Sequence, residues 1–256
     1  MADFPYLYPY SRGEAHRRGE TQMHEDSFRE NVSCARAIEQ AVRDHFQEQD
    51  EKLADGCARS VLERFGFKRV NFVLANSLLE FRKSSCNHLV SDETYQWGRK
   101  TFVPPDGKYN RHYAADTAAA LLEEFIGQAR AAYQELGLFG PEHCDSSAQD
   151  YDGKVLVLSL DTLRESCWTP RDQLWVSDGG FGCSPTASGR AVYATCLGDG
   201  EKTRWNRADF LGVLDEQYLP DWAAEKLAEL RGTTQKQADH SQERTDSPAQ
   251  GGMELR

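Results

Sequence analysis

Cysteine and histidine are the residues best suited to chemistry here, and their spacing forms no recognisable catalytic or metal-binding motif. The chain has seven cysteines and seven histidines, but they come close together only at Cys86–His88 and His143–Cys144. Structural zinc sites usually show two such pairs at regular spacing. A catalytic cysteine needs a base, most often a histidine, and the sequence pairs none with a cysteine. We therefore predict no catalytic residue, no metal site and no cofactor.

A glycine-rich segment, residues 178–190, is the second place where the residue types suggest chemistry. Glycine-rich backbone can surround an anion, and Arg190 could pair with that anion. However, the lysine and the Ser/Thr of a nucleotide-binding P-loop are missing. We favour a wide turn that joins two strands, and we keep Phe181 and Arg190 as candidate binding residues.

The other candidate binding residues are aromatic and amide side chains in the first half of the chain. Residues 4–10 are aromatic and broken by proline, so we expect an extended arm that either packs on the helices or forms a docking surface. Two asparagines interrupt an apolar helix, where a hydrogen-bonded structural role is the simpler interpretation and ligand contact the alternative. The candidates in this half are Tyr8, Tyr10, Asn71, Asn76, Tyr95 and Trp97.

Helices must position these side chains. Residues 60–81 form the densest apolar segment, and Gly66 divides it into two helices whose apolar residues recur at spacings of three and four. Residues 11–19 predict a short helical turn. Ser27 and Glu30 then form a capping box that opens a longer helix.

Downstream of the helix pair, the sequence predicts a long loop followed by one more helix. Residues 83–111 are polar and contain a Pro-Pro-Asp-Gly turn, which is typical of a loop; Tyr95 and Trp97 lie within it. An alanine-rich helix then begins at the cap residue Asp116 and ends at Gly137. Residues 140–153 are polar and turn-rich, as expected for a linker between domains.

After residue 153 the apolar pattern changes from helical to alternating. Strands are predicted at 154–160, 173–177, 191–197 and 202–206, and residues 198–201 join the last two in a hairpin. A closing helix begins at residues 219–222, and residues 232–256 have the composition of a disordered tail. The predicted fold class is α+β, with a helical domain over 1–139, a linker over 140–153 and a small, mainly antiparallel β domain with a closing helix over 154–231.

Charge and hydropathy restrict the class of protein. The formal net charge of −11 argues against a general nucleic-acid binder and is compatible with a basic protein partner. No run of apolar residues approaches the eighteen or so needed to span a membrane. The N-terminus lacks the basic start and apolar core of a signal peptide. We expect a cytoplasmic protein with no membrane partner.

Three stretches carry a resemblance to a known family: L-Y-P-Y-S-R-G-E-A-H-R-R-G-E, S-F-R-E-N-V-S-C-A-R-A-I-E-Q-A-V and R-F-G-F-K-R-V-N-F-V-L-A-N-S. Residues 6–137 resemble the domain of unknown function 3849, an uncharacterised bacterial family seen on conjugative elements and integrated mobile DNA. The later segment, with G-G-F-G-C-S-P and R-A-D-F-L-G-V-L, looks like an accessory module of proteins from such elements. The resemblance implies a setting on a mobile element and no assigned chemistry.

Two classes of function fit these observations. The first is a non-catalytic macromolecule-binding accessory protein of a bacterial mobile element, and an inhibitor of a host restriction or CRISPR-type defence system is its specific form. Its partner would be a protein of the host defence or of the mobile element. The alternative is an enzyme or sensor that acts on a nucleotide or small metabolite at a cleft between the two domains. Because no nucleophile–base pair or metal motif is present, we favour binding over catalysis.

Overall fold

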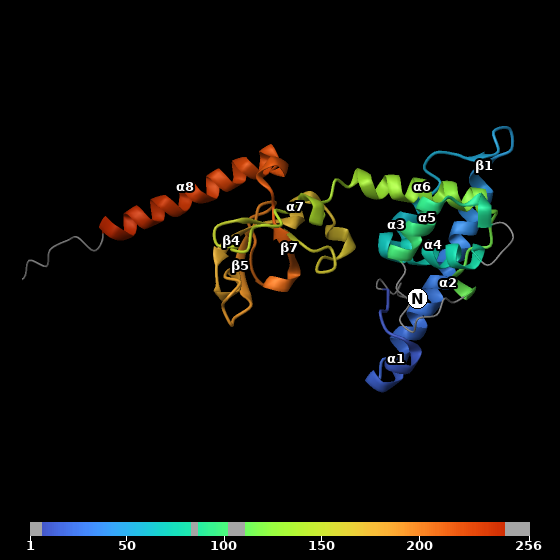
Figure 1. Ribbon diagram of the computed structural model, residues 1–256, viewed down its shortest axis with the longest axis horizontal. Coiled ribbons are helices and arrows are strands. Elements are labelled where there is room, and N and C mark those ends of the chain that lie inside the picture. Colours follow the sequence, from blue (N-terminus) through green and yellow to red (C-terminus); the bar gives the residue numbers. More distant parts are fainter. Residues whose placement is uncertain (1–6, 83–86, 102–110, 244–256) are drawn as a thin grey trace, which may run out of the picture. The chain divides into compact units, whose positions relative to one another are not determined.

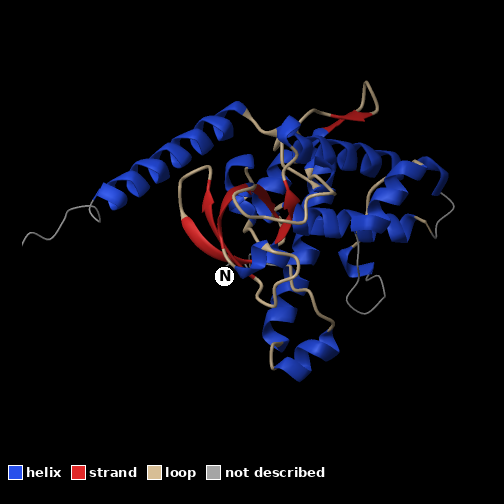
Figure 2. Ribbon diagram, turned by 60° about the vertical axis from the view of Figure 1, so that its left-hand side comes forward, coloured by secondary structure: helices blue, strands red, loops and turns tan. Residues whose placement is uncertain are grey.

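The computed structural model describes residues 7–82, 87–101 and 111–243, and the chain divides into two compact units, Met1–Leu136 and Gly137–Arg256 (Figure 1). The first unit is built of helices, and the second contains an antiparallel sheet followed by a long helix (Figure 2). This is the α+β fold class predicted from the sequence.

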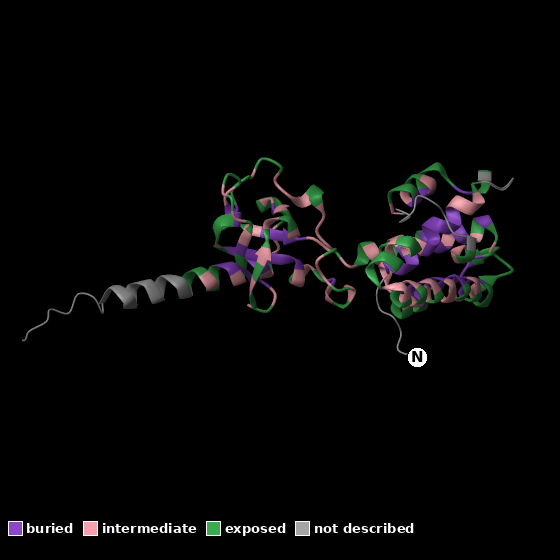
Figure 3. Ribbon diagram, turned by 90° about the horizontal axis from the view of Figure 1, so that it is seen from below, coloured by how far each residue is buried: buried purple, intermediate pink, exposed green. Residues whose placement is uncertain are grey.

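The first unit is a helical bundle with one small β-hairpin. Its helices are α1 (Arg12–Arg18), α2 (Thr21–His45), α3 (Arg59–Phe65), α4 (Phe67–Phe81), α5 (Asp92–Thr101) and α6 (Ala119–Glu135). Between α2 and α3, the short strands β1 (Phe46–Gln47) and β2 (Lys52–Leu53) pair antiparallel, which the sequence did not predict. Buried positions lie on the inward faces of the helices (Figure 3).

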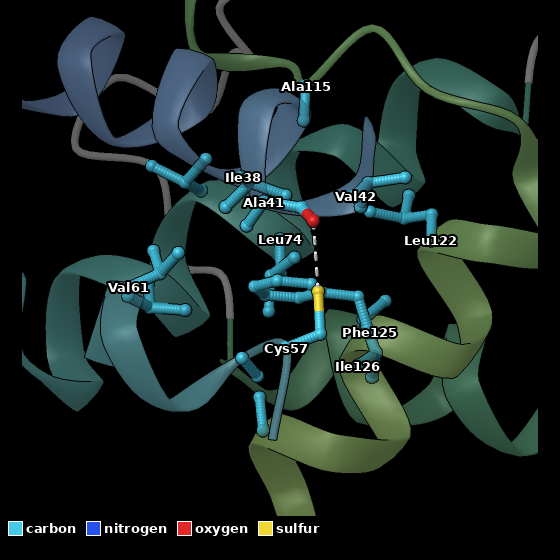
Figure 4. Close-up of a cluster of buried hydrophobic side chains, with 14 of the residues drawn as sticks. Ile38, Ala41, Val42, Cys57, Val61, Leu74, Ala115, Leu122, Phe125 and Ile126 are labelled. Atoms are coloured by element: carbon cyan, nitrogen blue, oxygen red, sulfur yellow. Dashed lines mark hydrogen bonds between the residues drawn. The ribbon is translucent and has the colours of Figure 1, made fainter. Parts of the chain in front are cut away.

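The predicted helix pair around Gly66 is confirmed. Gly66 has φ +77° and separates α3 from α4, a conformation that favours glycine because it has no Cβ. Leu74 of α4 lies in the core among side chains of α2, α3 and α6 (Figure 4). The Cys57 thiol, immediately before α3, donates a hydrogen bond to the Ala41 carbonyl oxygen of α2 at 3.4 Å.

Two predicted helix caps are wrong. Helix α2 begins at Thr21, and Ser27 is buried inside it, where its hydroxyl accepts a hydrogen bond from the Tyr8 backbone N–H at 3.0 Å. The capping-box pattern falls inside this helix because residues 21–26 contain no proline or glycine that would stop the helix from starting before Ser27. Helix α6 begins at Ala119 without a side-chain cap, and the Asp116 N–H instead donates to Glu39 Oε1 at 2.9 Å.

The expected loop over residues 83–111 contains helix α5. The Ser91 hydroxyl accepts a hydrogen bond from the Thr94 N–H at 3.2 Å, and two acidic residues occupy the first turn, both of which favour a helix start. Its buried face consists of Thr94 and Gly98. At Gly98 a Cβ atom would lie 2.8 Å from Leu78 Cδ1, so α5 packs closely on α4 at this position. Tyr95 and Trp97 add partly buried aromatic contacts with the core. The Pro-Pro-Asp-Gly turn lies outside the described residues.

The second unit is organised around a five-stranded antiparallel sheet with the order β6-β5-β4-β3-β7. Its strands are β3 (Val155–Leu158), β4 (Leu174–Gly179), β5 (Ala191–Cys196), β6 (Lys202–Asn206) and β7 (Phe210–Val213). The four predicted strands and the β5–β6 hairpin are present. Strand β7 was not predicted; it is short, contains Gly212 and follows β6 after a single 3-10 turn, so it lacks the alternation that identifies a strand.

Both faces of this sheet are buried against apolar side chains. One face packs Leu156, Trp175 and Val192 into a core, and on this side the Trp175 and Trp205 rings meet edge to face at 5.2 Å. The opposite face is covered by α8 (Asp221–Glu243), whose Ala223 and Leu227 pack on the strands. Successive residues of β3 face opposite sides of the sheet. Because both sides are buried, each of these residues is apolar, which explains the continuous apolar run.

Two predicted irregular segments differ from expectation. Residues 140–153, expected to be a linker, pack on the second unit: Tyr151 is buried, and the Asp145 N–H donates to the Val213 carbonyl oxygen at 2.9 Å. The expected disordered tail from residue 232 is helical as far as Glu243. A helix whose first turns are docked can propagate through a polar segment that contains no proline. Residues 244–256 lie outside the described part.

Candidate binding site

Two buried polar residues of α4, Arg69 and Ser77, form hydrogen bonds that hold the helical bundle together. The buried Arg69 donates from Nη1 to the Ser27 carbonyl oxygen at 3.1 Å and to Asn31 Oδ1 at 2.5 Å. Ser77 donates to the Val73 carbonyl oxygen at 2.8 Å and accepts from the Ala115 N–H at 2.9 Å. Buried polar groups of this kind are structural, because each would be costly without a partner.

The two candidate asparagines lie on the same helix but differ in access. Asn76 is 0% exposed, so a ligand cannot reach it; its place among the candidate binding residues is corrected, and the favoured structural interpretation remains. Asn71 is half-buried and lines none of the hollows described below.

The aromatic arm packs on the helical unit at Tyr8. Its ring is 8% exposed, its hydroxyl donates to Glu20 Oε2 at 2.6 Å, and its centroid is 5.7 Å from that of Tyr10. Tyr10 is 38% exposed, and the Arg18 guanidinium lies 3.8 Å from its ring centroid. Among the described arm residues 7–10, Tyr8 therefore anchors the arm to the helices, whereas Pro9 and Tyr10 are exposed to solvent.

The raised pKa of Tyr8 predicts how the thermal stability of the protein changes at alkaline pH. Burial, followed by the hydrogen bond to Glu20, raises the pKa of Tyr8 to about 12, whereas an unfolded tyrosine has a pKa near 10. The stabilising contribution of the protonated phenol is therefore complete below about pH 10 and is lost as the pH rises towards about 12. We expect the melting temperature of the wild type to fall relative to that of Tyr8→Phe across this window, with a constant difference between pH 7 and 9. A constant difference up to pH 12 would contradict the assignment.

Tyr95 and Trp97 both pack against the core of the first unit. Tyr95 also lines a polar hollow of about 730 Å³, which Trp97 does not. The lining residues are Arg82, His88, Val90, Ser91, Asp92, Tyr95, Gln96 and Arg99. The Arg82 guanidinium is 5.9 Å from the Tyr95 ring centroid. Two arginines would attract an anion here, but the Asp92 carboxylate on the same wall opposes it.

Three buried cysteines are poor nucleophiles. Burial raises the pKa of Cys34 to about 12 and the pKa values of Cys57 and Cys196 to about 11. The reactive thiolate is therefore scarce at these positions at neutral pH. Within the described ranges, no three His, Cys, Asp or Glu side chains are grouped to hold a metal ion.

The glycine-rich segment joins β4 to β5, so it connects two strands as the favoured interpretation predicted, but its two ends are packed closely and do not form a wide turn. Gly180 has φ +116°, and a Cβ atom there would lie 2.5 Å from the Ala191 carbonyl oxygen. At Gly189 a Cβ atom would lie 2.6 Å from the Cβ of Phe181. The glycines are therefore needed because the two ends of the turn lie against each other.

Arg207 holds this turn in place. Its guanidinium donates to the carbonyl oxygens of Gly182, Cys183 and Gln149 at 2.8, 2.9 and 2.7 Å, and it lies 3.8 Å from the Tyr151 ring centroid. The carbonyl oxygens of Gly182 and Cys183 in the turn thus point towards the Arg207 guanidinium, a cation of the chain itself. Arg190 is exposed at the end of the turn, and it does not line the hollow beside it.

Beside this turn lies a second hollow of about 600 Å³, which we call the aromatic hollow. Its lining residues are Asp150, Asp152, Gly180, Phe181, Cys183, Ser184, Ala191 and Tyr193. Phe181 is 78% exposed and Tyr193 is 53% exposed. An apolar surface rimmed by carboxylates is suited to binding a partner group by desolvation and charge together.

Sequence reasoning identified Phe181 but missed Tyr193, Asp150 and Asp152. Tyr193 had a detectable signal, because it alternates with the buried Val192 and Ala194 in β5 and must face the other side of the sheet. The two aspartates had none: their segment looked like a linker, and only its packing brings them beside the turn.

These features define an α+β protein with a helical unit and a sheet unit that carries a candidate binding hollow. The chain belongs to the protein family of unknown function DUF3849, whose model matches residues 7–134. The match lies within the first unit. Comparison with curated proteins and with solved structures found no match. None of the described helices is long and apolar enough to cross a membrane.

Proposed function

We propose that this chain is a non-catalytic binding protein that recognises another protein through the aromatic hollow. In this proposal it is an accessory protein of a bacterial mobile element and inhibits a host restriction or CRISPR-type defence system. The mobile-element setting rests on the resemblance of the helical unit and of the later segment to proteins of such elements.

The observation that carries the binding proposal is the 78% exposure of Phe181 on a constrained turn. A phenylalanine exposed on a mobile loop could fold back onto the protein, but the close contact at Gly189 and the Arg207 hydrogen bonds hold this turn. Large aromatic side chains fixed in an exposed position are typical anchors of protein interfaces. The net charge of −11 would speed association with a basic partner.

Affinity capture tests the proposal. The tagged full chain is expressed in bacteria that carry restriction and CRISPR-type systems, and co-purified proteins are quantified by mass spectrometry. We expect the wild type to enrich a defence protein. With Phe181→Ala the enrichment of that protein should be lower by at least about tenfold, the loss expected for an interface anchor. The enrichment should also fall as salt is raised, because charge steering is screened.

The matched control is Leu211→Ala, which removes another exposed apolar side chain of the same unit. This variant should capture the same partner as the wild type. Equal capture by Phe181→Ala and the wild type would show that the aromatic hollow is not the binding site, and recovery of no defence protein would overturn the inhibitor role.

A further inference from the structure

We infer that the aromatic hollow receives an arginine side chain of a basic protein segment. In this arrangement the guanidinium lies against the rings of Phe181 and Tyr193 and faces the carboxylates of Asp150 and Asp152. The inference rests on the proposed function, because it names the chemical group by which the partner is recognised.

The charges around the hollow favour a cation. Both titratable carboxylates that line it, Asp150 and Asp152, are exposed at its rim, and no basic residue is among its described lining. Arg190 ends the turn, and Arg204 lies opposite Tyr193 on β6, but neither lines the hollow. A guanidinium can form charge-assisted hydrogen bonds with carboxylates, which are stronger than neutral ones.

The rings favour arginine over lysine. Aromatic faces attract cations within about 6 Å of the ring centroid, and the planar guanidinium is more weakly hydrated than an ammonium group, so less hydration is lost on contact. The same unit already uses this contact internally: Arg207 lies 3.8 Å from the Tyr151 ring centroid, and Arg171 lies 4.6 Å from that of Trp222.

The hollow is also the right size and is held in shape before binding. A volume of about 600 Å³ lies within the range of known ligand sites, roughly 300–1,000 Å³, and accommodates one arginine with part of the flanking chain. The Tyr193 ring lies against Gly180, where a Cβ atom would be 3.2 Å from Tyr193 Cδ2. Because the turn is already ordered, little conformational entropy is lost on binding.

Fluorescence polarisation with the full chain tests the inference. The probe is a fluorescein-labelled Gly-Ser peptide with three arginines, compared with the same peptide carrying citrulline, which has nearly the shape of arginine without its charge, and with a lysine version. We expect the arginine peptide to bind at least about tenfold more tightly than the citrulline peptide and more tightly than the lysine peptide. Affinity should fall as salt is raised.

Variants separate the hollow from the overall acidity of the chain. Phe181→Ala should weaken arginine-peptide binding about tenfold, and Asp152→Asn about threefold. Two controls should stay within about twofold of the wild type: Leu211→Ala, and Asp199→Asn, which removes the same charge from the β5–β6 hairpin. Thermal melts check that all variants are folded.

Equal binding of the arginine and citrulline peptides, or equal losses for Asp152→Asn and Asp199→Asn, would overturn the inference. If Phe181→Ala nevertheless abolishes capture of the cellular partner, the proposed function stands and the hollow binds an uncharged group. If Phe181→Ala leaves that capture unchanged, the proposed function itself fails.

Discussion

Leu74→Ala should destabilise the helical unit by roughly 2–5 kcal/mol, the range for truncating a fully buried leucine. Leu74 is fully buried near the middle of α4, in a core shared by α2, α3 and α6 (Figure 4). The substitution removes apolar contacts and leaves a cavity that rigid helices cannot close. Urea unfolding followed by far-UV circular dichroism measures the loss as a lower midpoint with an unchanged slope.

Leu89→Ala is the matched control, because Leu89 belongs to the same unit and is 48% exposed. The same truncation there should change the free energy of unfolding by less than about 0.5 kcal/mol. A loss below about 1 kcal/mol for Leu74→Ala would mean that this face of α4 does not form the core.

Arg207→Ala should destabilise the second unit by about 3 kcal/mol and also weaken binding at the aromatic hollow. The substitution leaves three carbonyl oxygens without their shared charged donor, and hydrogen bonds to charged groups each contribute roughly 1.5–3 kcal/mol when well formed. Solvent reaches part of this site, so the total stays well below the sum. Tryptophan fluorescence in urea reports on this unit, because four of the five tryptophans, 168, 175, 205 and 222, lie in it.

Two variants show whether geometry or charge matters. Arg207→Lys keeps the charge but cannot direct a planar fork at three carbonyl groups, so it should recover less than half of the lost stability. Arg204→Ala removes an exposed arginine from β6 and should cost less than about 0.5 kcal/mol. If Arg204→Ala and Arg207→Ala destabilise the unit equally, then Arg207 does not clamp the turn.

The sequence by itself determined the elements whose information is local. The helix pair follows from apolar spacing and from Gly66, whose positive φ suits a residue without a Cβ. The strands β3 to β6 follow from alternation and from the Gly198–Gly200 hairpin signal. These predictions succeed because each depends only on residues that are close together in the sequence.

Helix α5, strand β7 and the helical start of the supposed tail needed the tertiary structure. The fully buried residues of α5 are a threonine and a glycine, and its aromatic residues Tyr95 and Trp97 are only partly buried, so the helix carries no fully buried apolar stripe. Strand β7 pairs with β3, which lies far away in sequence. Such pairing is decided by which segments meet and not by the local pattern.

The binding site shows the same division most clearly. The glycines around Phe181 were visible in the sequence, because clustered glycines mark a turn, but the exposure of Phe181 was not. Asp150 and Asp152 come from a segment that looked like a linker, and Arg207 binds the carbonyl oxygens of Gly182, Cys183 and Gln149. Composition shows that a residue is polar, but whether it is buried, paired or presented to a ligand depends on which distant backbone groups the fold places within hydrogen-bonding distance.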